Sequence, residues 1–217
     1  MLRGFSPCAI ATKPSSSISR CVVCPLMMPF SFDASGSRNR LASPIPVHGF
    51  QIWVNLPAKE KLIAPRYQDI PSKLIPIAES DDGKVWVKVI AGRSMGKEAV
   101  IDTRTAITFL HAKLKPGAKL VQPISPQYNT FAYVVEGKGY FGNEQLPAET
   151  DQLVLFSNDG QTVSIESSDK EELSVLILGG LPLNEPVARY GPFVMNTQSE
   201  IVQAIEDYKA GRMGLIK

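Results

Sequence analysis

The stretch NTFAYVVEGKGYFG, residues 129–142, joins a run of β-favouring side chains to a glycine-rich turn. Threonine, phenylalanine, tyrosine and valine dominate residues 130–135, and these residue types are enriched in strands. Residues 136–139 read Glu-Gly-Lys-Gly, which is typical of a turn between two strands. The stretch therefore predicts a strand that ends in a turn.

Similar alternating or β-rich runs recur on both sides of this stretch. They cover residues 50–56, 85–90, 105–114, 152–156, 161–166 and 173–178. Turn signals separate several of them, namely Asp-Asp-Gly at 81–83, Pro-Gly at 116–117 and Asn-Asp-Gly at 158–160. Short strands divided by turns, with no helices between them, predict an all-β fold, either an antiparallel barrel or a sandwich.

One helix is predicted near the C-terminal end. Thr197 is a suitable N-cap, and Glu200, three residues later, completes a capping box. An apolar stripe follows, made of Ile201, Ala204, Ile205 and Tyr208, and it ends before Gly211. We expect this stripe to pack on the protein's own sheet, because most amphipathic helices face the core.

Composition excludes several classes of protein. The chain has 217 residues, with 23 basic and 21 acidic side chains, so the net charge of +2 is too small to indicate nucleic-acid binding. No apolar run approaches the roughly 20 residues of a membrane-spanning helix. The two histidines, His48 and His111, form no His-x-His pair, which argues against a multi-histidine metal site.

Residues 1–45 differ from the rest of the chain. They contain five basic side chains, one acidic side chain and nine serines, which fits either a disordered leader or an organellar transit peptide. All three cysteines, Cys8, Cys21 and Cys24, lie there. A zinc or redox role for the Cys-x-x-Cys pair lacks further ligands, so we interpret these cysteines as incidental. The cysteine-free remainder fits a reducing compartment.

Three segments carry a family resemblance. They read GFQIWVNLPAKEKLIAPRYQDI (49–70), KVIAGRSMG…DTRTAITFLHAKLKPGA (88–118) and LNEPVARYGPFVMNTQSEIVQAIEDY (183–208). Together they resemble the pirin family of cupins, and residues 129–142 are similar to the central hairpin of a cupin. The resemblance implies a cupin-type antiparallel β-barrel, or jelly roll, with one C-terminal α-helix.

The resemblance also implies what this sequence lacks. Pirins are bicupins, whose N-terminal barrel binds iron through three histidines and one glutamate, placed before the strand that corresponds to 50–56. Neither a His-x-His nor a His-x-Glu pair precedes that strand here. We therefore expect a truncated pirin: a leader at 1–45, a remnant strand and linker of the N-terminal domain at 46–78, and the C-terminal cupin domain with its helix at 79–217.

The second barrel offers no replacement for that metal site. Where a metal-binding cupin places its ligands, this sequence has Pro123 and Ser125 early and residues 163–165 late. Their side chains are poor ligands for iron. We therefore predict a metal-free protein with no catalytic, cofactor-binding or metal-binding residues, and only a small apolar ligand is expected at the barrel mouth.

The remaining candidate residues are interpreted as structural. Alternation in 105–114 places His111 on the face opposite Leu110 and Ala112, where we expect a surface or hydrogen-bonded histidine without a catalytic role. His48 has no visible partner in the sequence. Trp53, Trp86 and Arg104 are expected to pack or to support strand pairing.

Three functions remain open at this stage. The favoured one is a non-catalytic binding or regulatory module, of the transcription-cofactor or signalling type. The alternatives are a quercetin 2,3-dioxygenase-type oxidoreductase, as implied for intact pirins, and an inactive truncated gene product. We expect protein partners or self-association, with no direct contact to nucleic acid or membrane. The expected location is the cytoplasm or nucleus, or a plastid or mitochondrion if residues 1–45 are a transit peptide.

Overall fold

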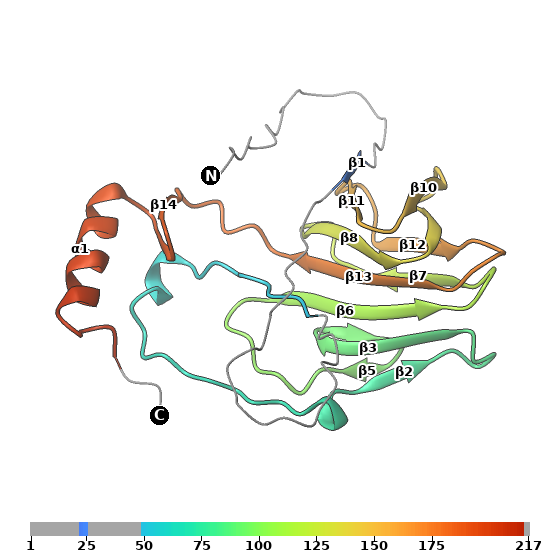
Figure 1. Ribbon diagram of the computed structural model, residues 1–217, viewed down its shortest axis with the longest axis horizontal. Helices are drawn as coiled ribbons and strands as arrows, with labels where there is room; N and C mark the ends of the chain where they lie inside the picture. The colour runs from blue at the N-terminus through green and yellow to red at the C-terminus, as the bar shows by residue number, and fades with distance from the viewer. Residues whose placement is uncertain (1–21, 26–48, 215–217) are drawn as a thin grey trace, which may run out of the picture.

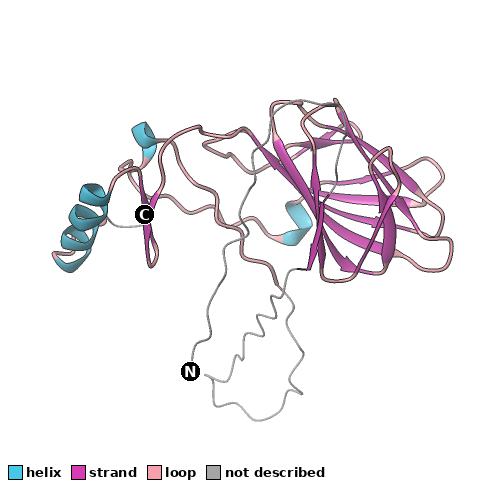
Figure 2. Cartoon of the chain, turned by 90° about the horizontal axis from the view of Figure 1, so that it is seen from above, coloured by secondary structure: helices cyan, strands magenta, loops and turns pink. Residues whose placement is uncertain are grey.

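The computed structural model describes residues 22–25 and 49–214, and two antiparallel sheets dominate it (Figures 1 and 2). In spatial order, the larger sheet contains β1 (Val22–Pro25), β11 (Gln152–Phe156), β8 (Asn129–Glu136), β13 (Leu173–Gly180), β6 (Ile107–Leu114), β3 (Val85–Ala91) and β2 (Ile77–Glu79). The smaller sheet contains β10 (Leu146–Glu149), β9 (Lys138–Phe141), β12 (Thr162–Ser167) and β7 (Lys119–Pro123). A short hairpin, β4 (Arg93–Ser94) and β5 (Lys97–Glu98), follows β3. The predicted all-β, cupin-type fold is confirmed.

The main core lies between the two sheets. Alternation on β3 and β6 sends Val87, Leu110 and Ala112 inward, and each of these side chains is fully buried. Phe141 from β9 and Ile165 from β12 meet them from the smaller sheet. The burial of these apolar surfaces is the main force that holds the sheets together.

A second apolar cluster covers the outer face of the larger sheet. We call it the outer cluster; it consists of Tyr133, Leu176 and Leu178 with the partly buried Phe109, Phe131, Val135 and Leu153. The central strand β13 pairs with β6 on one side and β8 on the other. The main core covers one face of this strand and the outer cluster covers the other, so its side chains are buried on both faces of the sheet. An antiparallel sheet more commonly exposes one polar face.

The predicted strand at 50–56 is wrong. The structure assigns no strand to these residues, and the side chains expected to be half-buried are largely exposed, with Val54 51% accessible. A strand needs backbone hydrogen bonds from a neighbouring strand, and none of the described strands pairs with this stretch. Alternation alone therefore misidentified an extended segment.

The predicted helix is confirmed as α1 (Gln198–Lys209). The Thr197 side chain accepts a hydrogen bond from the Glu200 amide, and the Glu200 carboxylate accepts from the Thr197 amide, so the capping box is complete. However, α1 does not pack on the barrel sheet. It packs on the hairpin of β14 (Ala188–Tyr190) and β15 (Phe193–Met195), burying Ile201 and Ala204.

These three elements, β14, β15 and α1, form what we call the C-terminal unit. It lies at a distance from the barrel, and extended chain links the two (Figures 1 and 2). Residues 49–76, here called the connecting segment, include two short 3-10 helices, η1 (Ala58–Glu60) and η2 (Ser72–Leu74). The helix η1 lies beside the C-terminal unit, so the connecting segment reaches both parts of the molecule.

The predicted leader at 1–45 lies outside the described residues except for Val22–Pro25. These four residues form β1, which pairs antiparallel with β11 at the edge of the larger sheet. The sequence predicted a disordered leader or a transit peptide at 1–45, and it did not predict this strand. Without β1, β11 would be the edge strand and would present unpaired backbone groups, with which β-branched residues such as valine favour pairing.

Candidate functional site

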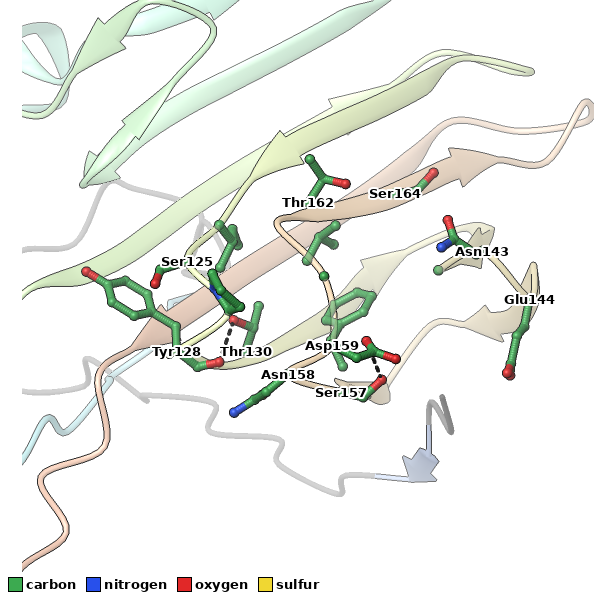
Figure 3. A pocket seen from close by; sticks show the side chains of 16 residues that line it. Ser125, Tyr128, Thr130, Asn143, Glu144, Ser157, Asn158, Asp159, Thr162 and Ser164 are labelled. Atoms are coloured by element: carbon green, nitrogen blue, oxygen red, sulfur yellow. Dashed lines mark hydrogen bonds between the residues drawn. The ribbon is translucent and has the colours of Figure 1, made fainter. Parts of the chain in front are cut away.

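One end of the barrel contains a cavity of about 350 Å³, which we call the mouth cavity. The β7–β8, β9–β10 and β11–β12 connections surround it, together with part of β12 (Figure 3). Its apolar lining comes from Ile124, Val163 and Phe156, which belong to the main core or pack against it. Tyr128 and Thr130 also line it.

Three of the residues at predicted ligand positions lie together at this cavity. Ser125, Val163 and Ser164 line it, whereas Pro123 lies at the end of β7 and Ile165 is fully buried in the core. The expectation of an apolar ligand is not supported by the lining, because serine, threonine and asparagine side chains outnumber the apolar ones. Sequence reasoning missed the other polar residues, such as Asn143, Ser157 and Asn158, since they lie on loops far apart in the chain.

The donor set at the mouth cavity does not fit the iron site that the family implies. Hydroxyl and amide groups dominate, and the acidic residues Glu144 and Asp159 belong to different loops. Within residues 22–25 and 49–214, no group of three or more histidine, cysteine, aspartate or glutamate side chains is placed to hold a metal ion. Iron in proteins is bound by imidazole and carboxylate groups, so this cavity is not built for it.

His111 lies on the outer face of β6, as the alternation predicts. Its Nε2 is 2.9 Å from the Ser174 hydroxyl on β13, and the Trp86 ring packs edge-on against it with a centroid distance of 5.7 Å. Burial lowers the pKa of His111, and the nearby Lys113 and Lys88 lower it further. The predicted hydrogen bond of His111 is therefore present, and the lowered pKa favours the neutral form of the imidazole.

Of the packing roles predicted for the two tryptophans, the structure confirms one and contradicts the other. Trp86 packs as predicted, but Trp53 is 65% exposed, so the packing role predicted for it is wrong. Its segment forms no strand, and the ring contact from this segment to the barrel is made by Phe50, which packs edge-on against Tyr133. Arg104 is exposed and precedes β6, where its charge helps to lower the pKa of Asp102 after the larger effects of Arg66. His48, Cys8 and Cys21 lie outside the described residues.

A hydrogen-bond network joins the connecting segment to the C-terminal unit. The Ala58 amide donates to Glu185 Oε2 over 2.8 Å, and Asn196 Nδ2 donates to the same oxygen over 3.0 Å. Lys61 Nζ donates to the Val194 carbonyl of β15 over 3.3 Å. Glu185 precedes β14 and Asn196 follows β15. The Glu185 carboxylate therefore connects η1 to both ends of the β14–β15 hairpin.

The Glu200 carboxylate reinforces the same region. It accepts hydrogen bonds from the Thr197 amide over 2.8 Å and from the Asn196 amide over 2.9 Å. These two bonds, in that order, hold the pKa of Glu200 below its usual value. The carboxylate therefore stays ionised at the N-terminus of α1, where a negative charge is favourable.

Large apolar side chains remain exposed on both parts that this network joins. In residues 50–63 of the connecting segment they are Phe50, Ile52, Trp53, Val54, Leu62 and Ile63. On and near the C-terminal unit they are Val187, Tyr190, Val202 and Tyr208. We call these ten residues the apolar set. Exposed apolar side chains occur singly on most proteins, whereas several of them together in one patch commonly mark a site of association.

Comparisons with known proteins agree on one family. A model of the pirin C-terminal cupin domain matches residues 109–214. A pirin-like protein from Solanum lycopersicum is 43% identical over 173 residues, which cover 80% of this chain and 59% of that protein. Pirin from Homo sapiens is 39% identical over 170 residues, covering 78% of this chain and 58% of that protein. The chain thus spans less than two thirds of the length of these relatives.

A solved structure from the comparisons has a fold similar to that of this chain. The crystal structure of quercetin 2,3-dioxygenase from Acinetobacter baumannii matches with a TM-score of 0.69 at 33% sequence identity. The match covers 76% of this chain and 56% of the dioxygenase chain. Within the described residues, no helix combines the length and apolar character needed to cross a membrane.

Proposed function

Because the chain carries the C-terminal cupin domain of the pirin family, we propose that it is a non-catalytic binding module that associates through its apolar set. In the absence of another protein partner, we propose that a second copy of the chain covers this surface. The observation that carries the proposal is the exposure of the apolar set on two segments fixed to each other by Glu185 and Lys61.

The packing of the C-terminal unit supports this proposal. Its helix buries only Ile201 and Ala204, while Val202 is 57% exposed and Tyr208 is 67% exposed. The Tyr208 ring contacts Phe193 of β15 edge-on, at a centroid distance of 6.0 Å, but most of its surface faces solvent. Burial of such side chains by a partner releases roughly 25 cal/mol for each Å² removed from water.

The test compares two valines of equal exposure. Val54 of the apolar set is 51% accessible, and Val121, on the smaller sheet, is 52% accessible. Light scattering coupled to size exclusion should give a mass above that of one chain at tens of micromolar. V54D should weaken this association at least tenfold, whereas V121D should leave it unchanged. A single-chain mass at every concentration, or an equal response of the two variants, would show the proposal to be wrong.

A second candidate function is favoured by the similarity to quercetin 2,3-dioxygenase from Acinetobacter baumannii. That activity belongs to the named relative, of whose length this chain covers 56%. The test is to express the full chain in iron-rich medium, measure bound iron, and follow flavonol consumption. One iron per chain together with turnover of quercetin would establish the dioxygenase and displace the non-catalytic proposal.

A further inference from the structure

We propose that the free edge of β14 pairs, antiparallel, with the same edge of β14 in a second copy of the chain. This inference rests on the association proposed above, and it names the strand through which the two copies join. The hairpin of β14 and β15 is a sheet of two strands, and none of the other described strands pairs with either of them. A two-stranded sheet is only marginally stable in water, so further strands on its open edge would stabilise it.

The length of the turn decides which backbone groups of β14 point outward. Only residues 191–192 connect the two strands, so Tyr190 and Phe193, which flank the turn, form a hydrogen-bonded pair. Hydrogen-bonded and non-hydrogen-bonded pairs alternate along an antiparallel ladder. Arg189 and Val194 are the next pair, so their amides and carbonyls point away from each other and out of the hairpin.

The other edge of the hairpin and one of its faces are already covered. Lys61 Nζ donates to the outward-pointing Val194 carbonyl over 3.3 Å, so the connecting segment lies against the β15 edge. Helix α1 packs on one face, where the Tyr208 ring contacts Phe193 (Figure 1). Within the described residues, no backbone hydrogen bond from outside the hairpin reaches Arg189. The β14 edge is therefore the open one.

This open edge is exposed and suited to strand pairing. Val187 is 65% accessible and Tyr190 is 66% accessible, and both residue types are enriched in strands. Proteins usually protect an edge strand with proline, a bulge or several charges. Residues 187–190 contain no proline and one charged side chain, that of Arg189. An edge of this kind can take up an additional strand.

The edge is complementary to a second copy of itself. A two-fold axis makes the pairing reciprocal, so each copy donates and accepts the same set of hydrogen bonds. An axis centred on Arg189 would place two guanidinium groups directly opposite each other, which is unfavourable. An axis centred on Val187 pairs two valines and places Arg189 opposite position 185 of the second copy, which is a glutamate. Charge therefore favours the second register.

Two variants at one position test the role of the backbone. Because the Arg189 amide points out of the hairpin, R189P removes no hydrogen bond within it, but it removes a donor from the open edge. R189A keeps this donor and is the matched control. Light scattering coupled to size exclusion should show that R189P weakens the association at least tenfold more than R189A does. R189A should have a small effect, because exposed ion pairs contribute little.

Amide hydrogen exchange gives a second measurement that needs no variant. In a single chain the Val187 and Arg189 amides face solvent and should exchange rapidly. Pairing should protect both amides increasingly as the concentration of the full chain rises from micromolar to hundreds of micromolar. The Tyr190 amide, which is bonded within the hairpin, shows whether the hairpin itself is folded, so this measurement still decides the question if R189P does not fold.

The results separate this inference from the association on which it rests. Association that V54D weakens, but that R189P weakens no more than R189A does and that leaves both amides unprotected, would refute the β14 pairing alone. A single-chain mass at every concentration would refute both proposals. Protection of the Val187 and Arg189 amides that does not change with concentration would mean that a segment of the same chain covers the edge, and it would overturn the pairing with a second copy.

Discussion

The Ala58 amide donates a 2.8 Å hydrogen bond to Glu185 Oε2, across 127 positions of sequence. Asn196 shares the same oxygen, so loss of the Glu185 carboxylate should loosen η1 from the C-terminal unit. We expect E185A to accelerate hydrogen exchange in residues 55–61 and at Asn196, while the barrel strands keep their protection. E206A, an exposed change on α1, is the control. Unchanged exchange in residues 55–61 would refute this role for Glu185.

Tyr133 donates a 2.8 Å hydrogen bond to Asp151 Oδ1. Burial, followed by this bond and the aspartate charge, raises the pKa of Tyr133 to about 12. A raised folded-state pKa gives stability that is complete below about pH 10 and is lost as the pH rises through the folded value. Absorbance titration should show one late phenol, absent in Y133F, and D151N should lower its pKa only partly, because burial is the larger cause. Titration of all tyrosines near pH 10 would contradict this.

His111 should make the protein less stable in acid. Its pKa is lowered, chiefly by burial, so the unfolded chain binds a proton more readily than the folded chain does. The associated stability is present above about pH 6.5 and falls as the pH drops towards and below the folded value. We expect H111Q to flatten the loss of stability below pH 6.5, measured by urea unfolding. The NMR titration of the His111 ring, assigned by its absence in H111Q, should have a midpoint below 6.5.

Gly137 should tolerate no side chain. Its φ is +87°, and a Cβ atom there would approach the Glu172 carbonyl oxygen to 2.1 Å. Gly83 also has a left-handed φ, of +62°, but a Cβ there would meet nothing within 4 Å. We expect G137A to lower the free energy of unfolding by about 3 kcal/mol or more, and G83A by about 1–2 kcal/mol, the cost of the left-handed conformation alone. Equal losses would show that the clash at Gly137 is relieved.

The elements that were correctly predicted depend on local chemistry or on burial. The capping box of Thr197 and Glu200 involves neighbours in sequence, so it can be recognised without a fold. Strands β6, β8 and β13 contain enough β-branched and aromatic residues to stand out. The strands that were missed, such as β10 and β2, are three or four residues long and have too few positions to show an alternation.

The candidate sites were harder to predict because they depend on distance in space. Ser125 and Ser164 meet at one cavity only because β7 and β12 are neighbouring strands, paired in a register that sequence does not reveal. Conversely, the regular alternation around Trp53 suggested a strand whose partner the described fold does not provide. The family resemblance was enough to predict the barrel, but it did not predict the polar lining of the mouth cavity.

The double-sided burial of β13 has a consequence before folding is complete. Residues 173–178 contain neither charge nor proline, and in the newly made chain both sets of side chains are exposed together. Segments with these properties associate readily with copies of themselves. The yield of folded protein should therefore depend on how quickly this strand is enclosed by β6 and β8, and slower synthesis or lower temperature during expression should raise the recovered fraction.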